Sequence, residues 1–219
     1  VHLGNKQAEE VHTLPLDEVI GREFGFPNCL ILEQIYQRER LFGIPESSFY
    51  LLNGREKMIT KSPIRLQALS MLDLHQKHTF WDIGFCTGSV SIEAKLQFPH
   101  LQIHAFECRP EGETLINLNT RKFGTPGIEY HIGDFMELDV SDLPAPDAVF
   151  IGGHGGKLTE MLQKIDRYLL PGGCMVFNSV SENSLHLFRE GIEAIDRRID
   201  NEIGITVDSY NPITIIKAI

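Results

Sequence analysis

Short apolar runs alternate with longer amphipathic segments from residue 79 to the end of the chain. Continuous runs of this kind are typical of strands buried on both faces, whereas apolar residues about every three to four positions indicate helices. Helical segments between the runs predict a parallel sheet, and two consecutive runs at the end predict an antiparallel hairpin. The fold class is therefore α/β, with a seven-stranded, mostly parallel sheet, a final antiparallel hairpin and helices on both faces. The expected strands are 79–83, 102–107, 128–132, 147–151, 174–178, 203–207 and 213–216, and the expected helices are 89–98, 110–123, 157–170 and 182–196.

The chain before residue 79 does not follow this alternation. Ser62 is expected to cap a helix with Pro63 in its first position, because both residue types favour helix starts. Nearer the N-terminus, a short helix is expected at 17–20 and a strand at 29–32. The expected units are an N-terminal segment, 1–42, and a main domain, 43–219.

Composition narrows the class of protein. The 219 residues carry 20 Lys+Arg against 30 Asp+Glu, a formal net charge of −10. This acidity argues against a nucleic-acid partner, which needs a basic face, and no apolar run is long enough to span a membrane. The scattered cysteines are typical of reduced thiols, so we expect a cytoplasmic protein.

A loop that contains glycine follows the first expected strand, where an open α/β sheet binds ligands. A nicotinamide fingerprint fails there, because Cys86 stands where its second glycine would be. The pattern Asp82-x-Gly84-x-x-Thr87-Gly88 instead resembles the first motif of class I S-adenosylmethionine (SAM)-dependent methyltransferases, which have a Rossmann-like fold. The resemblance implies SAM as the cofactor and, as cofactor-binding residues, Asp82, Gly84, Cys86, Thr87 and Gly88.

Acidic residues at two further strand ends support a cofactor site. Glu107, 19 residues after Gly88, can accept both ribose hydroxyls, and Asp134 resembles the contact to the adenine amino group. We also place Thr60 and Gly152 among the cofactor-binding residues.

Longer segments resemble one narrower family, the decarboxylating precorrin-6Y C5,15-methyltransferases of cobalamin biosynthesis, in their C15-methylating domain. The most specific are Thr-Gly-Ser-Val-Ser-Ile-Glu at 87–93 and Phe-Ile-Gly-Gly-His-Gly-Gly at 150–156. The resemblance covers about 43–219 and implies C-methylation at C15 of a (cobalt-)precorrin with decarboxylation of the ring C acetate. Other matching segments are Gly43–Pro45, Met58–Lys61, Trp81–Gly84, Phe123–Gly124, Pro146–Val149, Pro171–Gly173 and Asn211–Ile213.

The first 33 residues resemble the end of a C5-methylating domain, with Leu3-Gly4, Glu10 and a last strand at 29–32. Such domains occur fused in many bacteria, so we expect the C5-methylating domain upstream in a parent chain. The family resemblance also implies a homotetramer. Apolar residues that could form its interface, or equally pack on the domain's own sheet, are Phe42, Phe49, Tyr50, Leu51 and Leu52.

One segment of this acidic chain is basic. Arg55, Lys57, Lys61 and Arg65 stand against Glu56, a local balance of +3. A cationic rim would attract the acetate and propionate groups of an anionic tetrapyrrole, although a solvated loop would explain most of these charges. Because Lys61 precedes a helix N-terminus, where the dipole disfavours a cation, we expect Lys61 and Arg65 to bind substrate.

The glycine-rich stretch after the fourth strand has bare amides that can meet carboxylate oxygens. We expect Gly153, Gly155 and Gly156 to bind substrate. His154 is a candidate helper in decarboxylation, or else a solvent-exposed loop residue. No metal ligands of the protein are expected, since any cobalt would arrive with the substrate. The expected catalytic residues are His154, Thr60 and Lys61.

Two alternatives stay open from the sequence. One is a SAM-dependent methyltransferase of another small molecule or of tRNA, of the N1-adenine type. The other is a scaffold that keeps SAM only structurally.

Overall fold

The computed structural model describes residues 4, 7–33, 35, 41–208 and 212–219, and the chain divides into two compact units, Val1–Glu39 and Arg40–Ile219. In the first unit, the expected short helix is α1 (Leu16–Val19). The strand expected at 29–32 is wrong: these residues are exposed and form no strand. The described part of this unit contains no strand with which these residues could pair. Leu3, which carried part of the resemblance here, and Asn211 lie outside the described residues.

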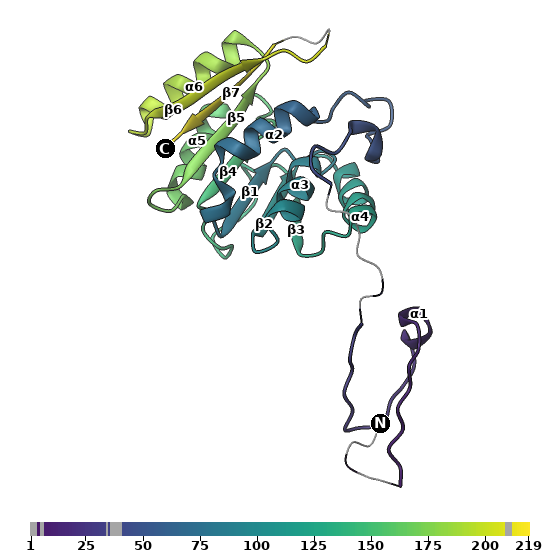
Figure 1. Ribbon diagram of the computed structural model, residues 1–219. Coiled ribbons are helices and arrows are strands. Elements are labelled where there is room, and N and C mark those ends of the chain that lie inside the picture. Colours follow the sequence, from purple (N-terminus) through teal and green to yellow (C-terminus); the bar gives the residue numbers. More distant parts are fainter. Residues whose placement is uncertain (1–3, 5–6, 34, 36–40, 209–211) are drawn as a thin grey trace. The chain divides into compact units, whose positions relative to one another are not determined.

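The second unit contains one seven-stranded sheet in the order β3-β2-β1-β4-β5-β7-β6 (Figure 1). Neighbours from β3 to β5 pair in parallel, and β7 runs antiparallel to both β5 and β6. The expected fold class is thereby confirmed. The order reverses direction between β1 and β4, which is where open α/β sheets bind ligands. The strands are β1 (Thr79–Ile83), β2 (Gln102–Glu107), β3 (Ile128–Ile132), β4 (Ala148–Ile151), β5 (Cys174–Ser179), β6 (Ile199–Ile205) and β7 (Ile213–Ala218).

Helices cover both faces of the sheet. α5 and α6 pack on one face, while α2, α3 and α4 pack on the other (Figure 1). The helices are α2 (Ser62–Met71), α3 (Ser89–Gln97), α4 (Glu111–Phe123), α5 (Leu158–Tyr168) and α6 (Glu182–Ala194), with short 3₁₀ turns η1 (Glu46–Ser48) and η2 (Leu74–Gln76). In the described residues, no helix is both long and apolar enough to cross a membrane.

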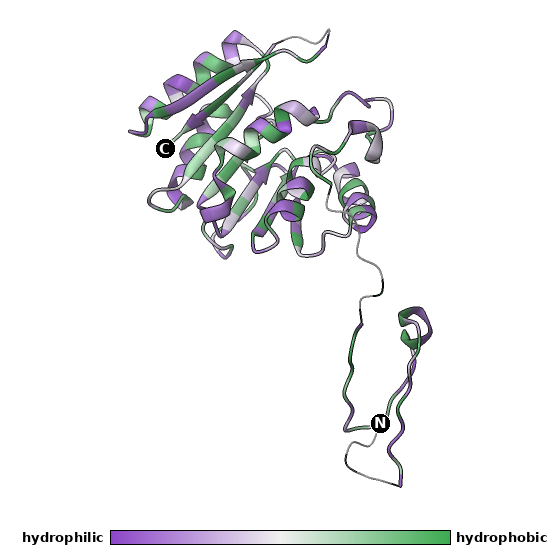
Figure 2. Cartoon of the chain, viewed as in Figure 1, coloured by the Kyte–Doolittle hydropathy of each residue, from purple (hydrophilic) through white to green (hydrophobic). Residues whose placement is uncertain are grey.

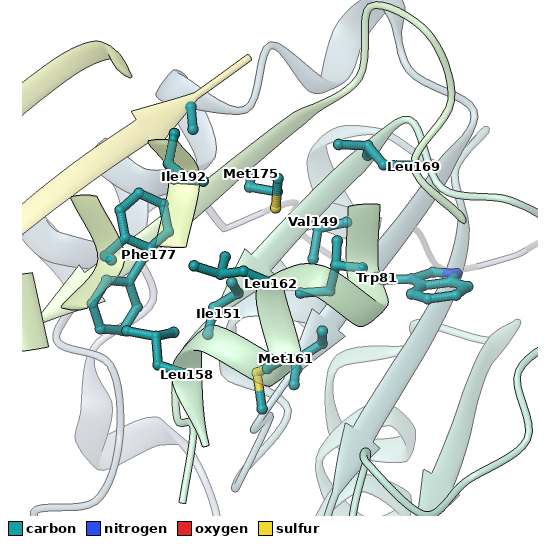
Figure 3. Packing of buried hydrophobic residues seen from close by; sticks show 14 of the residues in the cluster. Trp81, Val149, Ile151, Leu158, Met161, Leu162, Leu169, Met175, Phe177 and Ile192 are labelled. Carbon is teal, nitrogen blue, oxygen red and sulfur yellow. The ribbon is translucent and has the colours of Figure 1, made fainter. Parts of the chain in front are cut away.

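The core follows from the alternation of side chains along buried strands. In β1, Phe80 packs on the α2–α3 face and Trp81 on the α5–α6 face, and neither is exposed. Figure 2 shows apolar colour along the central strands and mixed colour on the outer helices. On the α5–α6 face, Val149 and Leu162 belong to one cluster (Figure 3). The rigid centre of the sheet therefore holds the ends of β1 and β4 in place.

Two expectations about element ends are wrong. Helix α2 begins at Ser62 itself, so Lys61 takes the cap position and Pro63 the second helical position. Ser62 uses its backbone N–H, which donates to the carboxylate of Glu46. Strand β6 begins at Ile199, before the expected 203, because this edge strand starts with exposed polar residues that a search for apolar runs misses.

The apolar residues at 42–52 divide between core and surface. Phe49 is buried in a cluster with Ile44 and Ile92, which makes it unavailable to another chain. Phe42 and Tyr50 are exposed by 71% and 48%. Packing on the domain itself therefore accounts for part of this group.

Candidate active site

A cavity of about 670 Å³ opens at the carboxyl ends of the central strands. Three segments contribute to its wall: the cofactor loop, residues 84–88, the glycine loop, residues 152–156, and the wall segment, residues 57–61. The β6–β7 hairpin closes the other side with apolar side chains. Segments far apart in the sequence thus meet at the switch point of the sheet.

The cofactor loop and the glycine loop touch backbone to backbone. Gly84 has φ +81°, and a Cβ atom there would lie 2.7 Å from the amide nitrogen of Gly153. The Gly152 N–H donates to the carbonyl of Ile83 at 2.8 Å, which ties the glycine loop to the end of β1. A side chain at Gly84 would separate the loops, so this position requires glycine both for its φ and for the close approach.

Glu107 is buried at the cavity wall, at the end of β2. One carboxylate oxygen accepts from the Cys86 amide at 2.9 Å. The other accepts from the Arg109 guanidinium at 2.9 Å, from the Arg109 amide at 3.0 Å and from the Cys108 thiol at 3.3 Å. Each carboxylate oxygen has about two acceptor sites, so the oxygen bound to Cys86 keeps one site for a ligand's hydroxyl. Glu107 therefore joins the cofactor loop to β2 and presents a negative group to the cavity.

Cys86 occupies the left-handed region, with φ +51°. Its thiol donates to the Met58 carbonyl, with the sulfur 3.0 Å from the oxygen. Burial, followed by the charge of Glu107, raises the pKa of this thiol to about 11, so it stays protonated at neutral pH. Cys86 thus links the cofactor loop to the wall segment.

Asp82, Thr87 and Gly88 do not line the cavity but shape the cofactor loop from behind. The Ser91 hydroxyl donates to Asp82 at 2.6 Å, and burial raises the pKa of Asp82 to about 7. The other Asp82 oxygen has no hydrogen-bond partner among the described residues. These residues support the loop whose Gly84 and Cys86 face the cavity.

Asp134 lines the cavity beyond β3 and pairs with Lys157 at 2.8 Å. The hydrogen bond from Lys157, with that from the Met136 amide, lowers the pKa of Asp134. Both side chains of the pair are about half exposed, which leaves them accessible to a ligand.

His154 lines the cavity from the glycine loop, beside Gly153 and Gly155, while Gly156 lies outside the lining. The Gly156 N–H donates to Nδ1 at 3.2 Å, so the neutral ring carries its proton on Nε2. The imidazole packs edge-on against Phe177, and burial lowers its pKa. At neutral pH this side chain is therefore an uncharged hydrogen-bond donor through Nε2.

Thr60 and Lys61 line the cavity in the wall segment, but Arg65 does not. Its side chain is fully buried, and Nε lies 2.5 Å from a carboxylate oxygen of Glu93. The expectation that Arg65 contributes to a cationic rim is therefore wrong, because its charge is neutralised inside the protein and not presented to a ligand.

Residues 52–201 match the sequence model of the precorrin methyltransferase domain family. The chain belongs to this family.

Two relatives of this precorrin methyltransferase domain show how far the similarity extends. The cobalt-precorrin-6B C(15)-methyltransferase (decarboxylating) of Salmonella typhimurium is 39% identical over 135 residues, which cover 62% of this chain and 69% of the relative. The precorrin-6Y C(5,15)-methyltransferase (decarboxylating) of a Sinorhizobium species is 37% identical over 123 residues, 56% of this chain and 29% of that longer protein.

A solved structure supports the same assignment. The crystal structure of precorrin-6Y C5,15-methyltransferase from Geobacter metallireducens has a TM-score of 0.75 and 33% identity, and covers 83% of this chain and 98% of that chain. The architecture of the family member described here is therefore that of class I SAM-dependent methyltransferases.

Several cavity residues of this precorrin methyltransferase domain were missed from the sequence. Asn178 and Val180 lie at the carboxyl end of β5. Because ligands bind at the carboxyl ends of strands in an open α/β sheet, their positions could have been predicted. Arg109 and Lys157 carry no motif, and their roles depend on their carboxylate partners. The apolar residues of the hairpin wall are Ile205, Val207 and Ile213.

Proposed function

We propose that this chain transfers a methyl group from SAM to C15 of a (cobalt-)precorrin and decarboxylates the ring C acetate. The contact between Gly84 and Gly153 carries this proposal, because it joins two loops of one cavity that we expect to bind the cofactor and the carboxylates of the substrate. The family match and the named activities of the relatives support this function over methylation of tRNA or of another small molecule.

The residues around the cofactor loop fit SAM. Gly84 and Cys86 of the cofactor loop line the cavity, and Glu107 beside them offers an acceptor for a ribose hydroxyl. Asp134 would meet the adenine amino group, and Thr60 and Gly152 border the same cavity. When bound, SAM supplies an electrophilic methyl group, so the protein must chiefly align the reactants and exclude water.

Charge complementarity supports an anionic substrate in an acidic protein. Lys61 borders the cavity on the wall segment, and the bare amides of Gly153 and Gly155 border it on the glycine loop. The hairpin wall would cover the apolar part of a tetrapyrrole. A carboxylate moved from water to such a place loses hydration, which favours the loss of CO2. His154 would donate a hydrogen bond from Nε2 to the substrate.

Replacement of Gly153 tests this placement. A Cβ atom at Gly153 meets no atom within 4 Å, so Gly153→Val should fold while its side chain enters the cavity. We expect turnover of a (cobalt-)precorrin substrate to be abolished, measured as a methyl group gained and CO2 lost in the product mass, while calorimetry still detects SAM binding. Gly204→Val, at an open position on edge strand β6, is the matched control. Full turnover by Gly153→Val would contradict the placement.

We further infer that residues 1–33 are the end of an upstream C5-methylating domain and that a linker follows up to residue 42. The Sinorhizobium relative supports this, because it is much longer than the matched segment. Tetramer formation and a cytoplasmic location stay predictions. Light scattering at micromolar protein checks the first, and a monomeric mass would contradict it.

A further inference from the structure

Arg65 and Glu93 form a fully buried ion pair between α2 and α3. Neither side chain is exposed at all, and the Nε atom of Arg65 lies 2.5 Å from Oε2 of Glu93. A buried charge pair is weak evidence for stability, because desolvation offsets the attraction. The remaining hydrogen bonds of the two side chains therefore indicate what the pair does.

The other hydrogen bonds of this pair go to backbone groups of the segments before α2. The Nη1 atom of Arg65 donates to the Thr60 carbonyl at 2.7 Å, and Nη2 donates to the Ile44 carbonyl. The other oxygen of Glu93 accepts from the amides of Gly43 and Ile44. A planar guanidinium spreads these donors over three nitrogen atoms in a fixed fork, whereas the donors of an ammonium group all leave one atom.

The wall segment, residues 57–61, forms neither helix nor strand. Its position must therefore come from contacts with its surroundings. Two of these start from the cofactor loop and its helix: the Cys86 thiol binds the Met58 carbonyl, and Glu93 acts through Arg65 on the Thr60 carbonyl. The cofactor loop and its helix are thus joined to the wall segment at two points.

We propose that Arg65 and Glu93 are positioning residues, which hold Thr60 and Lys61 at the cavity through the Thr60 carbonyl. This rests on the proposed function, in which the wall segment contacts the tetrapyrrole. The pair fixes the distance between the wall segment and the cofactor loop, because Glu93 belongs to α3, the helix that directly follows the cofactor loop. A purely structural pair would stabilise the fold without affecting substrate binding.

A double apolar replacement separates these roles. Exchange of a buried ion pair for apolar residues of similar volume is often neutral for stability. In Arg65→Met/Glu93→Leu we expect a folded protein with a substrate KM raised about tenfold, which corresponds to about 1.4 kcal/mol. Arg65→Lys keeps the charge opposite Glu93 but not all the carbonyl contacts, so we expect a smaller rise in KM. The matched control is Arg197→Met/Asp166→Leu, a partly buried pair that does not line the cavity, which should leave KM unchanged.

Hydrogen exchange supplies a readout that does not need activity. We expect faster exchange of the peptide that covers 57–61 in the double variant, with unchanged exchange in β1 and β4. A folded double variant with wild-type KM and wild-type exchange at 57–61 would overturn the proposal. If the wild-type protein converts no corrin precursor, the proposed function fails, and the exchange result still decides whether the pair positions the wall segment.

Discussion

The replacement Gly84→Ala tests the contact on which the site depends. Gly84 lies in the left-handed region at φ +81°, and its Cβ would approach the amide nitrogen of Gly153 to 2.7 Å. Atoms of the backbone cannot move aside like the end of a flexible side chain. The substitution must therefore separate the cofactor loop from the glycine loop or strain both.

The size of the effect follows from two costs. An alanine in the left-handed region costs about 1 kcal/mol relative to glycine. Overpacking against rigid neighbours costs about 1 to 3 kcal/mol more, so the expected loss in the free energy of unfolding is about 2 to 4 kcal/mol. For a domain of this size each kcal/mol lowers Tm by about 2 to 4 °C, which predicts a decrease of about 4 to 16 °C.

Thermal unfolding followed by circular dichroism measures this decrease, and calorimetry measures the accompanying loss of SAM affinity. The control is Gly153→Ala on the other side of the contact, because its Cβ meets nothing within 4 Å and its φ is not positive. We expect the Tm of the control to lie within about 2 °C of wild type, a smaller shift than a loss of about 1 kcal/mol in the free energy of unfolding would cause. If Gly84→Ala matches the control in both Tm and SAM affinity, the reasoning about this contact is refuted.

Two further substitutions test electrostatics. Glu107→Gln keeps the shape of the side chain but removes the charge beside Arg109. We expect SAM affinity, measured by calorimetry, to fall by about 10- to 100-fold, because a hydrogen bond to a charged group contributes about 1.5 to 3 kcal/mol. An unchanged affinity would place the ribose elsewhere. Burial lowers the pKa of both His104 and His131, so their neutral forms stabilise the fold above about pH 6.5 and this contribution is lost as the pH falls below it. The raised pKa of Asp82 has the opposite effect, because it increases the stability of the fold as the pH falls. To isolate the contribution of His104, the free energy of unfolding in urea is therefore compared between His104→Gln and wild type at about pH 7.5 and 5.5. We expect the variant to lose less stability than wild type between these values, and equal losses would contradict the role of His104.

The sheet could be read from the sequence because its central strands are buried on both faces. β4 is an unbroken apolar run, and β1, which is also buried along its whole length, has the bounds that were expected. β6 starts earlier than expected because an edge strand with exposed polar residues has no such pattern. Edge strand β3 nevertheless has the expected bounds, so local pattern fails where a run of exposed polar residues lies within the strand, as in β6.

The residues of the candidate site likewise divide into those that the sequence could predict and those that it could not. Gly84 and Glu107 could be recognised because their residue types and strand-end positions meet a chemical need, close backbone approach and paired acceptors. Arg65 was misassigned, since charge along the chain does not reveal a carboxylate partner 28 residues away. Lys157 was missed for the same reason, because its place depends on Asp134.

By itself the sequence determined the order of strands and helices, the edge of the sheet that carries the site, and the residues of the cofactor loop. These depend on local periodicity and on the topology that βαβ units impose. Only the tertiary structure decided which charges face the cavity and which are neutralised in the interior. The packing of α2 on α3 buries Arg65 against Glu93 and leaves Lys61 at the cavity, although both cations lie in one short basic segment. Burial and pairing are properties of the folded neighbourhood, and residues far apart in the chain create it.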